Sequence, residues 1–313
     1  MRAIFFGTPD IAVPSLRALC DVAEVTAVVC QPDRPAGRGM KLRPPPVKAA
    51  ALELGLPVHQ PTKVRNAAFR QWVESQQADV ALVIAYGRIL PQAVLDGPRR
   101  GCMNLHASIL PRYRGAAPIN WAIVHGETET GIALMQMDAG MDTGPVFTTR
   151  TLPIGSHETA GELAERLGEL AATVVREDLP RAVAGDVEAT PQDHDAATMA
   201  PMMSKDDGRV DWSLPASRVH DHARGMTPWP GAHTTVDGKR FKVLATRRSA
   251  AESDAPPGTV VDIVTSDDEP HAVVSCGHGC IALLRGQLAG KKALDAAQLA
   301  AGRTLAPGTV LGT

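Results

Sequence analysis

The sequence predicts an α/β fold, in which a doubly wound, mostly parallel sheet is followed by a smaller β-barrel domain. Over residues 1–185, short apolar runs alternate with amphipathic segments, which is the pattern of parallel strands joined by helices. From residue 205 onward, short strand-like runs recur at regular spacing between Gly, Asp and Pro, which is typical of a small barrel. We therefore predict domains over residues 1–185 and 205–313, joined by a polar linker over residues 186–204.

The first domain begins with residues 2–7, an apolar run that ends in Gly and predicts a strand buried on both faces. A helix is predicted to start at Thr8-Pro9-Asp10, and this turn lacks the Gly-x-Gly-x-x-Gly spacing of a dinucleotide site. Further apolar runs predict strands over residues 25–30, 57–59, 79–86, 101–105, 130–137 and 146–152. The sequence predicts helices over residues 66–76, 119–125 and 158–184.

The second domain is predicted to hold one helix and a series of short strands. The helix covers residues 215–224, and its His220 and His222 are expected at the surface. Strands are expected over residues 234–236, 241–245, 258–264, 271–275 and 280–284. Basic residues accumulate in this domain, as an ordinary solvated surface or as a groove for nucleic acid: Lys239, Arg240, Lys242, Arg247, Arg248, Lys291, Lys292 and Arg303.

Composition narrows the class of protein and its surroundings. The 313 residues, with 44% hydrophobic and 21% charged, suit a globular chain of one or two domains. The net charge of −2 requires any RNA binding to come from local basic patches. No apolar run approaches the roughly 20 residues that span a bilayer, so no membrane partner is expected. Five scattered cysteines favour reduced thiols in a cytoplasmic protein. Separately, we expect the protein to be a monomer.

Cys276, His278 and Cys280 are candidate metal ligands. Two Cys that flank a His are possible ligands, but no second ligand pair lies at zinc-finger spacing. Gly277 and Gly279 predict a hairpin turn here instead. We therefore predict no metal.

The most informative stretch of the chain follows the buried strand over residues 101–105. Asn104 and His106 are two residues apart, so a strand would direct both side chains to one face. An amide donor and an imidazole at the carboxyl end of a strand suit the polarisation of a carbonyl group. The Gly-rich segment over residues 137–144 supplies a carboxylate, from either Asp138 or Asp142, and spacing alone does not separate the two. The set predicts acyl transfer without a Ser or Cys nucleophile.

The segments that carry this chemistry resemble the folate-dependent formyltransferases. The core of the resemblance is Asn-x-His-x-Ser-(hydrophobic)₂-Pro-x-(aromatic)-Arg-Gly from Asn104, followed by Met-Asp-x-Gly-x-Asp-Thr-Gly from Met137. The loop over residues 31–39 and the C-terminal segment narrow the resemblance to the members that act on charged tRNA. The other matching segments are Phe6-Gly7-Thr8-Pro9, Asp211-Trp212-Ser213 and Pro228-Trp229-Pro230.

The resemblance implies a reaction and assigns residues to it. It implies a Rossmann-like formyltransferase domain, an OB-like tRNA-binding domain, and formyl transfer from 10-formyltetrahydrofolate to the methionine amine of initiator methionyl-tRNA. Asn104, His106 and Asp142 match the family's catalytic residues, and the pattern selects Asp142 over Asp138. The folate co-substrate is expected to contact two segments of the chain, at Ser108, Ile109, Leu110 and Pro111 and at Tyr86, Gly87 and Ile89.

The loop over residues 31–46 is long for a connection between a strand and a helix, and it is rich in basic residues. Composition alone favours a solvated surface loop, with an RNA-binding finger as the alternative. The resemblance favours the finger, because there the loop meets the acceptor end of the tRNA. It assigns this contact to Arg38, with Arg34, Lys41 and Arg43 beside it.

Three other functions compete with this interpretation. A hydrolase that delivers water to the formyl folate would use the same Asn, His and Asp, but it would need no basic loop. A formyltransferase for a small amine, such as an amino sugar or glycinamide ribonucleotide, would leave the C-terminal domain without a role. A non-enzymatic RNA-binding module would leave Asn104, His106 and Asp142 without one.

Overall fold

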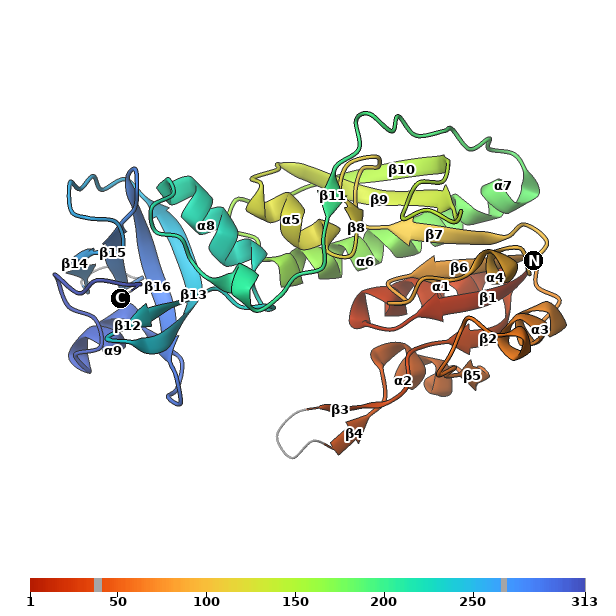
Figure 1. Ribbon diagram of the computed structural model, residues 1–313, viewed down its shortest axis with the longest axis horizontal. Helices are drawn as coiled ribbons and strands as arrows, with labels where there is room; N and C mark the ends of the chain where they lie inside the picture. The colour runs from red at the N-terminus through yellow and green to blue at the C-terminus, as the bar shows by residue number, and fades with distance from the viewer. Residues whose placement is uncertain (37–40, 266–268, 313) are drawn as a thin grey trace. The chain divides into compact units, whose positions relative to one another are not determined.

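The computed structural model describes residues 1–36, 41–265 and 269–312 (Figure 1). The chain divides into two compact units, each built from segments that are separate in the sequence. Unit 1 comprises Met1–Pro118, Glu129–Leu152 and Ala164–Pro201. Unit 2 comprises Ile119–Thr128, Pro153–Leu163 and the chain from Met202 onward.

Unit 1 is built on a sheet with the strand order β10-β9-β7-β6-β1-β2-β5. The strands from β7 to β5 pair in parallel, whereas β9 runs antiparallel to β7, so the predicted doubly wound, mostly parallel sheet is confirmed. The bounds are β1 Arg2–Gly7, β2 Glu24–Val29, β5 Val58–His59, β6 Val80–Ile84, β7 Cys102–His106, β9 Glu129–Gln136 and β10 Val146–Pro153. Strands β1, β6 and β7 are buried almost throughout, as strands covered on both faces are.

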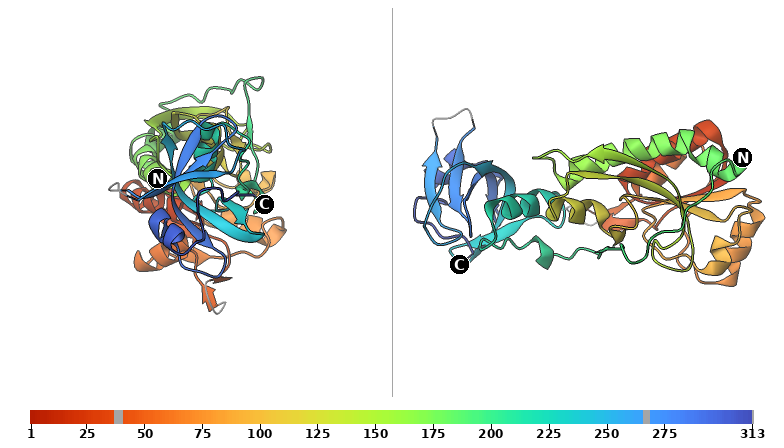
Figure 2. Two further views of the ribbon diagram at one scale, coloured as in Figure 1. Left: turned by 90° about the vertical axis from the view of Figure 1, so that its left-hand side faces the viewer. Right: turned by 90° about the horizontal axis from the view of Figure 1, so that it is seen from above.

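Helices cover both faces of this sheet, and Figure 2 (right) shows α1 and α6 on the face opposite α3. Helix α1 (Val13–Val22) follows a 3₁₀ turn at Asp10–Ala12, and α6 (Ala160–Glu177) packs against that turn through Gly168. On the other face, α3 (Ala67–Ser75) and α4 (Gln92–Leu95) enclose a core that includes Ile4, Phe6, Phe69 and Val94. Asn66 caps α3 by accepting a hydrogen bond from the Phe69 amide at 2.8 Å.

The structure corrects one expected helix and adds one that the sequence did not predict. The predicted single helix over residues 158–184 is two helices, α6 and α7 (Leu179–Ala184), with Asp178 between them. Pro180 explains the break, because its nitrogen cannot donate to the preceding turn. Helix α2 (Pro46–Glu53) was not predicted, although Val47, Ala50 and Ala51 are buried on one side of it.

Unit 2 contains an antiparallel sheet with the order β12-β13-β16-β15-β14, so the prediction of a separate β domain is confirmed. The bounds are β12 His233–Val236, β13 Lys239–Ser249, β14 Val260–Val264, β15 His271–Ser275, β16 Cys280–Leu288 and β17 Leu294–Asp295. The unit also holds α5 (Pro118–Val124), α8 (Ala216–Gly225) and the unpredicted α9 (Ala296–Ala301). Asp295 and Gln298 form a capping box at the start of α9.

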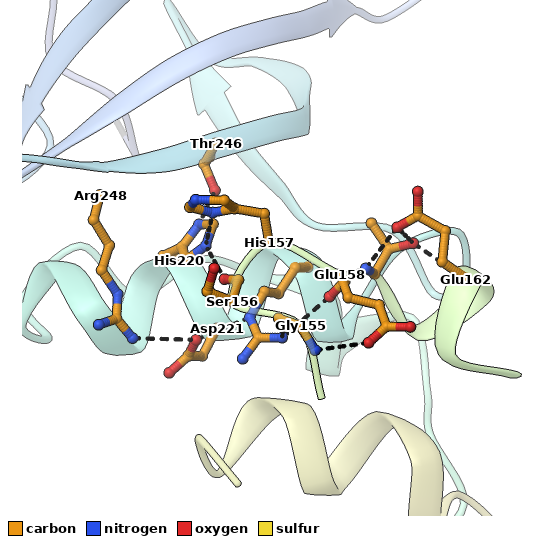
Figure 3. A network of polar contacts seen from close by, with 11 residues as sticks. Gly155, Ser156, His157, Glu158, Glu162, His220, Asp221, Thr246 and Arg248 are labelled. Atoms are coloured by element: carbon orange, nitrogen blue, oxygen red, sulfur yellow. Dashed lines mark hydrogen bonds and ion pairs between the residues drawn. The ribbon is translucent and has the colours of Figure 1, made fainter. Parts of the chain in front are cut away.

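The expectation of a surface position is wrong for His220, and His222 is only partly exposed. His220 is 1% exposed, and its Nδ1 and Nε2 lie 2.8 Å from Thr246 Oγ1 and 3.0 Å from Ser156 O (Figure 3). Because a carbonyl oxygen only accepts, Nε2 carries the proton and Nδ1 accepts from the threonine hydroxyl. His222 donates through Nε2 to Asp207 O at 2.7 Å. Sequence polarity was misleading for His220, because both of its ring nitrogens have hydrogen-bond partners that allow the imidazole to be buried.

In the described part of the chain, no helix is both long and apolar enough to cross a membrane. All five cysteines are free thiols, and burial raises the pKa of Cys276 to about 12.

Burial lowers the pKa of His220 and of His222, which predicts acid sensitivity. Well above the unfolded pKa of about 6.5, both groups are neutral in the folded and unfolded states, so their contribution to stability is complete there. As the pH falls through the unfolded value of about 6.5, the unfolded state binds protons first and the free energy of unfolding decreases. We expect His220→Gln to reduce this decrease between pH 7.5 and 5.5, measured by urea unfolding.

The exposed His278 provides the control for this measurement. His278→Gln should leave the pH dependence of the free energy of unfolding unchanged. An unchanged pH dependence in His220→Gln would show that this buried ring does not contribute to it.

Candidate active site

The carboxyl end of β7 places Asn104 and His106 in the same buried region of unit 1. Asn104 lies beside Met135 of β9 and Val83 of β6, and His106 lies beside Ala133 of β9. The two side chains belong to alternate positions of one strand and are therefore on the same face of the sheet. Both residues are buried.

The imidazole of His106 lies between two hydrogen-bond acceptors. Its Nε2 is 2.8 Å from Tyr113 O, and its Nδ1 is 3.6 Å from Asp142 Oδ2. The Tyr113 carbonyl only accepts, so Nε2 carries a proton. The other ring nitrogen, Nδ1, faces the Asp142 carboxylate. This arrangement places a carboxylate beside a buried imidazole.

Asp142, rather than Asp138, is the carboxylate beside His106. Its Oδ2 accepts a hydrogen bond of 2.9 Å from the Gly115 amide, which directs the carboxylate toward the ring. The backbone of Asp142 has a φ of 54°, a left-handed conformation that Asp tolerates better than most residues. Asp138 instead shapes the loop, because its Oδ1 accepts from Gly140 N at 3.0 Å and from Thr143 Oγ1 at 2.7 Å.

The residues over 108–111, expected at the folate site, lie directly after His106. Ser108 is fully buried, and its hydroxyl donates to Arg112 O at 2.7 Å, which stabilises the turn that follows the strand. Leu110 is buried beside Ala133 and Met135, and Ile109 is partly exposed. The peptide bond between Leu110 and Pro111 is cis. This segment thus borders the His106 region with its backbone and partly exposed apolar side chains.

The second expected folate segment, residues 86–89, leads from β6 to a pocket. The Tyr86 ring is buried against Phe6, and its carbonyl accepts from Thr8 Oγ1 at 3.0 Å. Gly87 has a φ of 81° with open space around it, and Ile89 is 62% exposed. Ile89 borders a surface pocket of about 580 Å³, whose lining includes Leu90, Pro91, Arg65, Arg70 and Ala139. Ala139 belongs to the same loop as Asp142. This loop therefore contributes one residue to the pocket lining and the carboxylate that lies beside His106.

The basic loop forms a short hairpin of β3 (Arg34–Ala36) and β4 (Lys41–Arg43). Arg38 lies outside the described residues, as does the side chain of Lys41. Arg34 and Arg43 are exposed and lie opposite each other across the hairpin. At the base of the hairpin, Lys48 Nζ is 2.8 Å from Asp33 Oδ1, and hydrogen bonds from Lys48 and Gln60 lower the pKa of Asp33. The hairpin is therefore anchored at its base, and it presents a pair of like charges.

Part of the expected linker over residues 186–204 contacts the residues of this site, which the sequence did not predict. The short strand β11 (Met199–Ala200) pairs in parallel with β8 (Arg114–Gly115), and Thr190 bridges Val146. Within this segment, Gln192 donates through Nε2 to Asp142 O at 2.9 Å. No sequence pattern marked Gln192, because its role depends on the chain returning to a loop about fifty residues earlier.

The comparison with known families defines the class of protein. Residues 1–179 match the family model "Formyl transferase", and residues 202–304 match "Formyl transferase, C-terminal domain". Among solved structures, a sugar 3N-formyl transferase, WlaRD, aligns with a TM-score of 0.65 at 15% identity, covering 93% of this chain and 99% of that chain. That similarity shows a shared fold. The chain is thus a formyl transferase by both of its domains.

Sequence relatives make the assignment more specific. A protein of Sorangium cellulosum named methionyl-tRNA formyltransferase is 65% identical over all of both chains. One of Geobacter sulfurreducens with the same name is 47% identical over all of this chain and 97% of its own. The methionyl-tRNA formyltransferase structure from Clostridium thermocellum aligns with a TM-score of 0.55 at 14% identity, over 89% of this chain and 100% of that chain. The chain belongs to the methionyl-tRNA formyltransferase family.

Gly115 tests whether the position of the Asp142 carboxylate is constrained. Its φ is 119°, and an added Cβ would lie 2.7 Å from the carbonyl oxygen of Ala200. Gly115→Ala should therefore displace the amide that holds Asp142 and lower turnover by about 10-fold or more. Steady-state formyl transfer measures this effect.

Gly55→Ala is the matched control, because Gly55 also has a positive φ of 68° but no atom within 4 Å of its added Cβ. It should cost about 1–2 kcal/mol of stability with normal turnover. Normal turnover in a folded Gly115→Ala variant would show that the Asp142 position is not constrained in this way.

Proposed function

We propose that this protein transfers the formyl group of 10-formyltetrahydrofolate to the methionine amine of initiator methionyl-tRNA. The observation that carries the proposal is the buried His106 between the Asp142 carboxylate and the Tyr113 carbonyl, on the same face of β7 as Asn104. Such a set favours acyl transfer. Asn104 would supply a hydrogen-bond donor, His106 a positive charge and Asp142 a proton acceptor to the same reacting group.

The chemistry follows from these groups. The neutral amine attacks the formyl carbon, and the carbonyl electron pair moves onto oxygen. The Asn104 amide would donate to this oxyanion, and the positive charge of the His106 imidazolium would stabilise it. Asp142 would keep the ring charged and accept the amine proton, directly or through water. Collapse of the intermediate breaks the bond to folate N10, which leaves with a proton as tetrahydrofolate. No covalent enzyme intermediate is required.

The pocket beside Ile89 supports the placement of folate. Its wall offers apolar contact through Ile89, Leu90 and Pro91, as a flat aromatic co-substrate requires. Arg65 and Arg70 line the same pocket, and the glutamate tail of folate carries carboxylates. Arg70 already pairs with Glu74 at 2.8 Å, so Arg65 is the better candidate for the tail. The backbone of residues 108–111 would border the reacting end. No metal takes part in this proposal.

The hairpin supports tRNA as the acceptor. Like charges opposite each other on paired strands destabilise the pairing, so Arg34 and Arg43 favour an anionic partner. Phosphate groups would supply the neutralising charge, and Arg38 and Lys41 between them would add to the contact. The basic side chains of unit 2 are a second candidate surface for the RNA backbone. A formyltransferase for a small amine would have no need of either feature.

A comparison of acceptors tests the proposed function. The protein is incubated with 10-formyltetrahydrofolate labelled in the formyl group and with charged initiator tRNA, free methionine, an amino sugar or water. We expect label on the charged tRNA at a rate at least about 10²-fold above the rate with any other acceptor, because the tRNA contributes binding energy away from the amine. Uncharged tRNA is the control. Release of labelled formate as the main product would instead support the hydrolase.

The hairpin arginines predict a separation of RNA binding from folate binding. Arg34→Ala and Arg43→Ala should each raise the KM for charged tRNA several-fold. Each variant should also make this KM less dependent on salt concentration, because a complex with fewer phosphate contacts releases fewer counterions when it forms. The KM for folate should not change. Kinetics between 50 and 200 mM KCl would measure both effects.

Arg99→Ala is the control for this measurement, because Arg99 is exposed at the amino end of β7, away from the site. It should leave both KM values unchanged. An equal rise in the folate KM of the hairpin variants would contradict the placement of the hairpin on the RNA side.

A further inference from the structure

Gln192 uses its whole hydrogen-bonding capacity to join two parts of the active site. Its Nε2 donates to Asp142 O at 2.9 Å and to Gly144 O at 2.7 Å. Its Oε1 accepts from Arg114 Nε at 3.1 Å and from Arg114 Nη2 at 2.7 Å. Arginine only donates and carbonyls only accept, so the orientation of the amide is fixed by its partners. The side chain therefore holds the backbone on both sides of residue 143.

Arg114 strengthens this junction. Its side chain is buried, and within the described residues no carboxylate forms an ion pair with it. Its Nη2 also meets His194 Nδ1 at 3.1 Å. A buried cation must be stabilised by hydrogen bonds, and it polarises the amide that accepts from it, which makes that amide a stronger donor. The next residue, Gly115, donates its amide to Asp142 Oδ2. Arg114 and Gly115 thus act on the backbone and on the carboxylate of Asp142.

We propose that Gln192 is a positioning residue for the formyl-transfer reaction, which holds Asp142 in its left-handed conformation and so keeps the carboxylate beside His106. The inference rests on the proposed function, in which Asp142 is the proton acceptor. Without the two donated hydrogen bonds, the Gly-rich loop would be free to relax away from a φ of 54°. A displacement of about 1 Å is enough to lower turnover by about 100-fold.

The segment that carries Gln192 has other attachments, so a change of this side chain acts locally. Thr198 Oγ1 accepts from Tyr113 N at 2.9 Å, and Thr198 O accepts from Arg114 N at 2.8 Å. Strand β11 adds its pairing with β8, and Thr190 keeps its bridge to Val146. These contacts do not involve the Gln192 amide. The segment therefore stays in place when only the amide changes.

Gln192→Glu separates positioning from stability. The carboxylate keeps the shape of the amide and pairs with the buried Arg114, but it cannot donate to Asp142 O or Gly144 O and repels both. We expect kcat to fall at least about 10-fold, with KM values for folate and tRNA within about twofold of the wild type and Tm unchanged or higher. Gln192→Ala should lower both kcat and Tm. Gln77→Glu, on the surface after α3, is the matched control and should leave kcat unchanged.

A second comparison uses the Asp142→Ala background. If Gln192 acts through Asp142, adding Gln192→Glu to Asp142→Ala should lower kcat by no more than about twofold further. A folded Gln192→Glu variant with wild-type kcat, or a full additional loss in the Asp142→Ala background, would overturn the inference. A wild-type protein that forms no formyl-methionyl-tRNA would instead overturn the proposed function, so the two failures are distinct.

Discussion

The position of the Asp142 carboxylate is the constraint on which the catalytic unit depends. A buried imidazole next to a carboxylate is useful only if the two are held together. A Gly-rich loop is flexible, so contacts from other segments must fix the position of Asp142. Two other segments do so: Gly115 binds the carboxylate, and Gln192 binds the backbone of Asp142 and Gly144. The sheet supplies His106 on a rigid strand. The site thus combines one rigid element with a loop that is fixed from outside.

Much of this could be predicted from the sequence, because the relevant signals are local. Apolar runs such as residues 2–7 and 101–105 predicted the parallel strands, and the spacing of Asn104 and His106 predicted their common face. The choice between Asp138 and Asp142 could not be made from spacing, because it depends on which carboxylate the Gly115 amide reaches. Gln192 was missed for the same reason, since its partners lie about fifty and eighty residues earlier.

Other differences between prediction and structure have a common physical cause. His220 is polar and lies on a helix with a polar sequence, yet it is buried because Ser156 and Thr246 satisfy both ring nitrogens. Residues 190–200 lack an apolar pattern, yet they dock through backbone pairing, which leaves no mark on side-chain composition. Sequence patterns report hydrophobic burial well, whereas burial that depends on specific hydrogen-bond partners requires the structure.

The central claim is that His106 and Asp142 act as one catalytic unit, and a double-mutant cycle tests it most directly. The measurement is kcat for His106→Gln, Asp142→Asn and the double variant, under saturating formyl folate and charged tRNA. Residues that act as a unit are strongly non-additive. The account predicts that each single variant loses about 10²-fold or more, and that the double variant loses little more than the worse single one. Losses that multiply fully would contradict it, because His106 and Asp142 would then contribute independently.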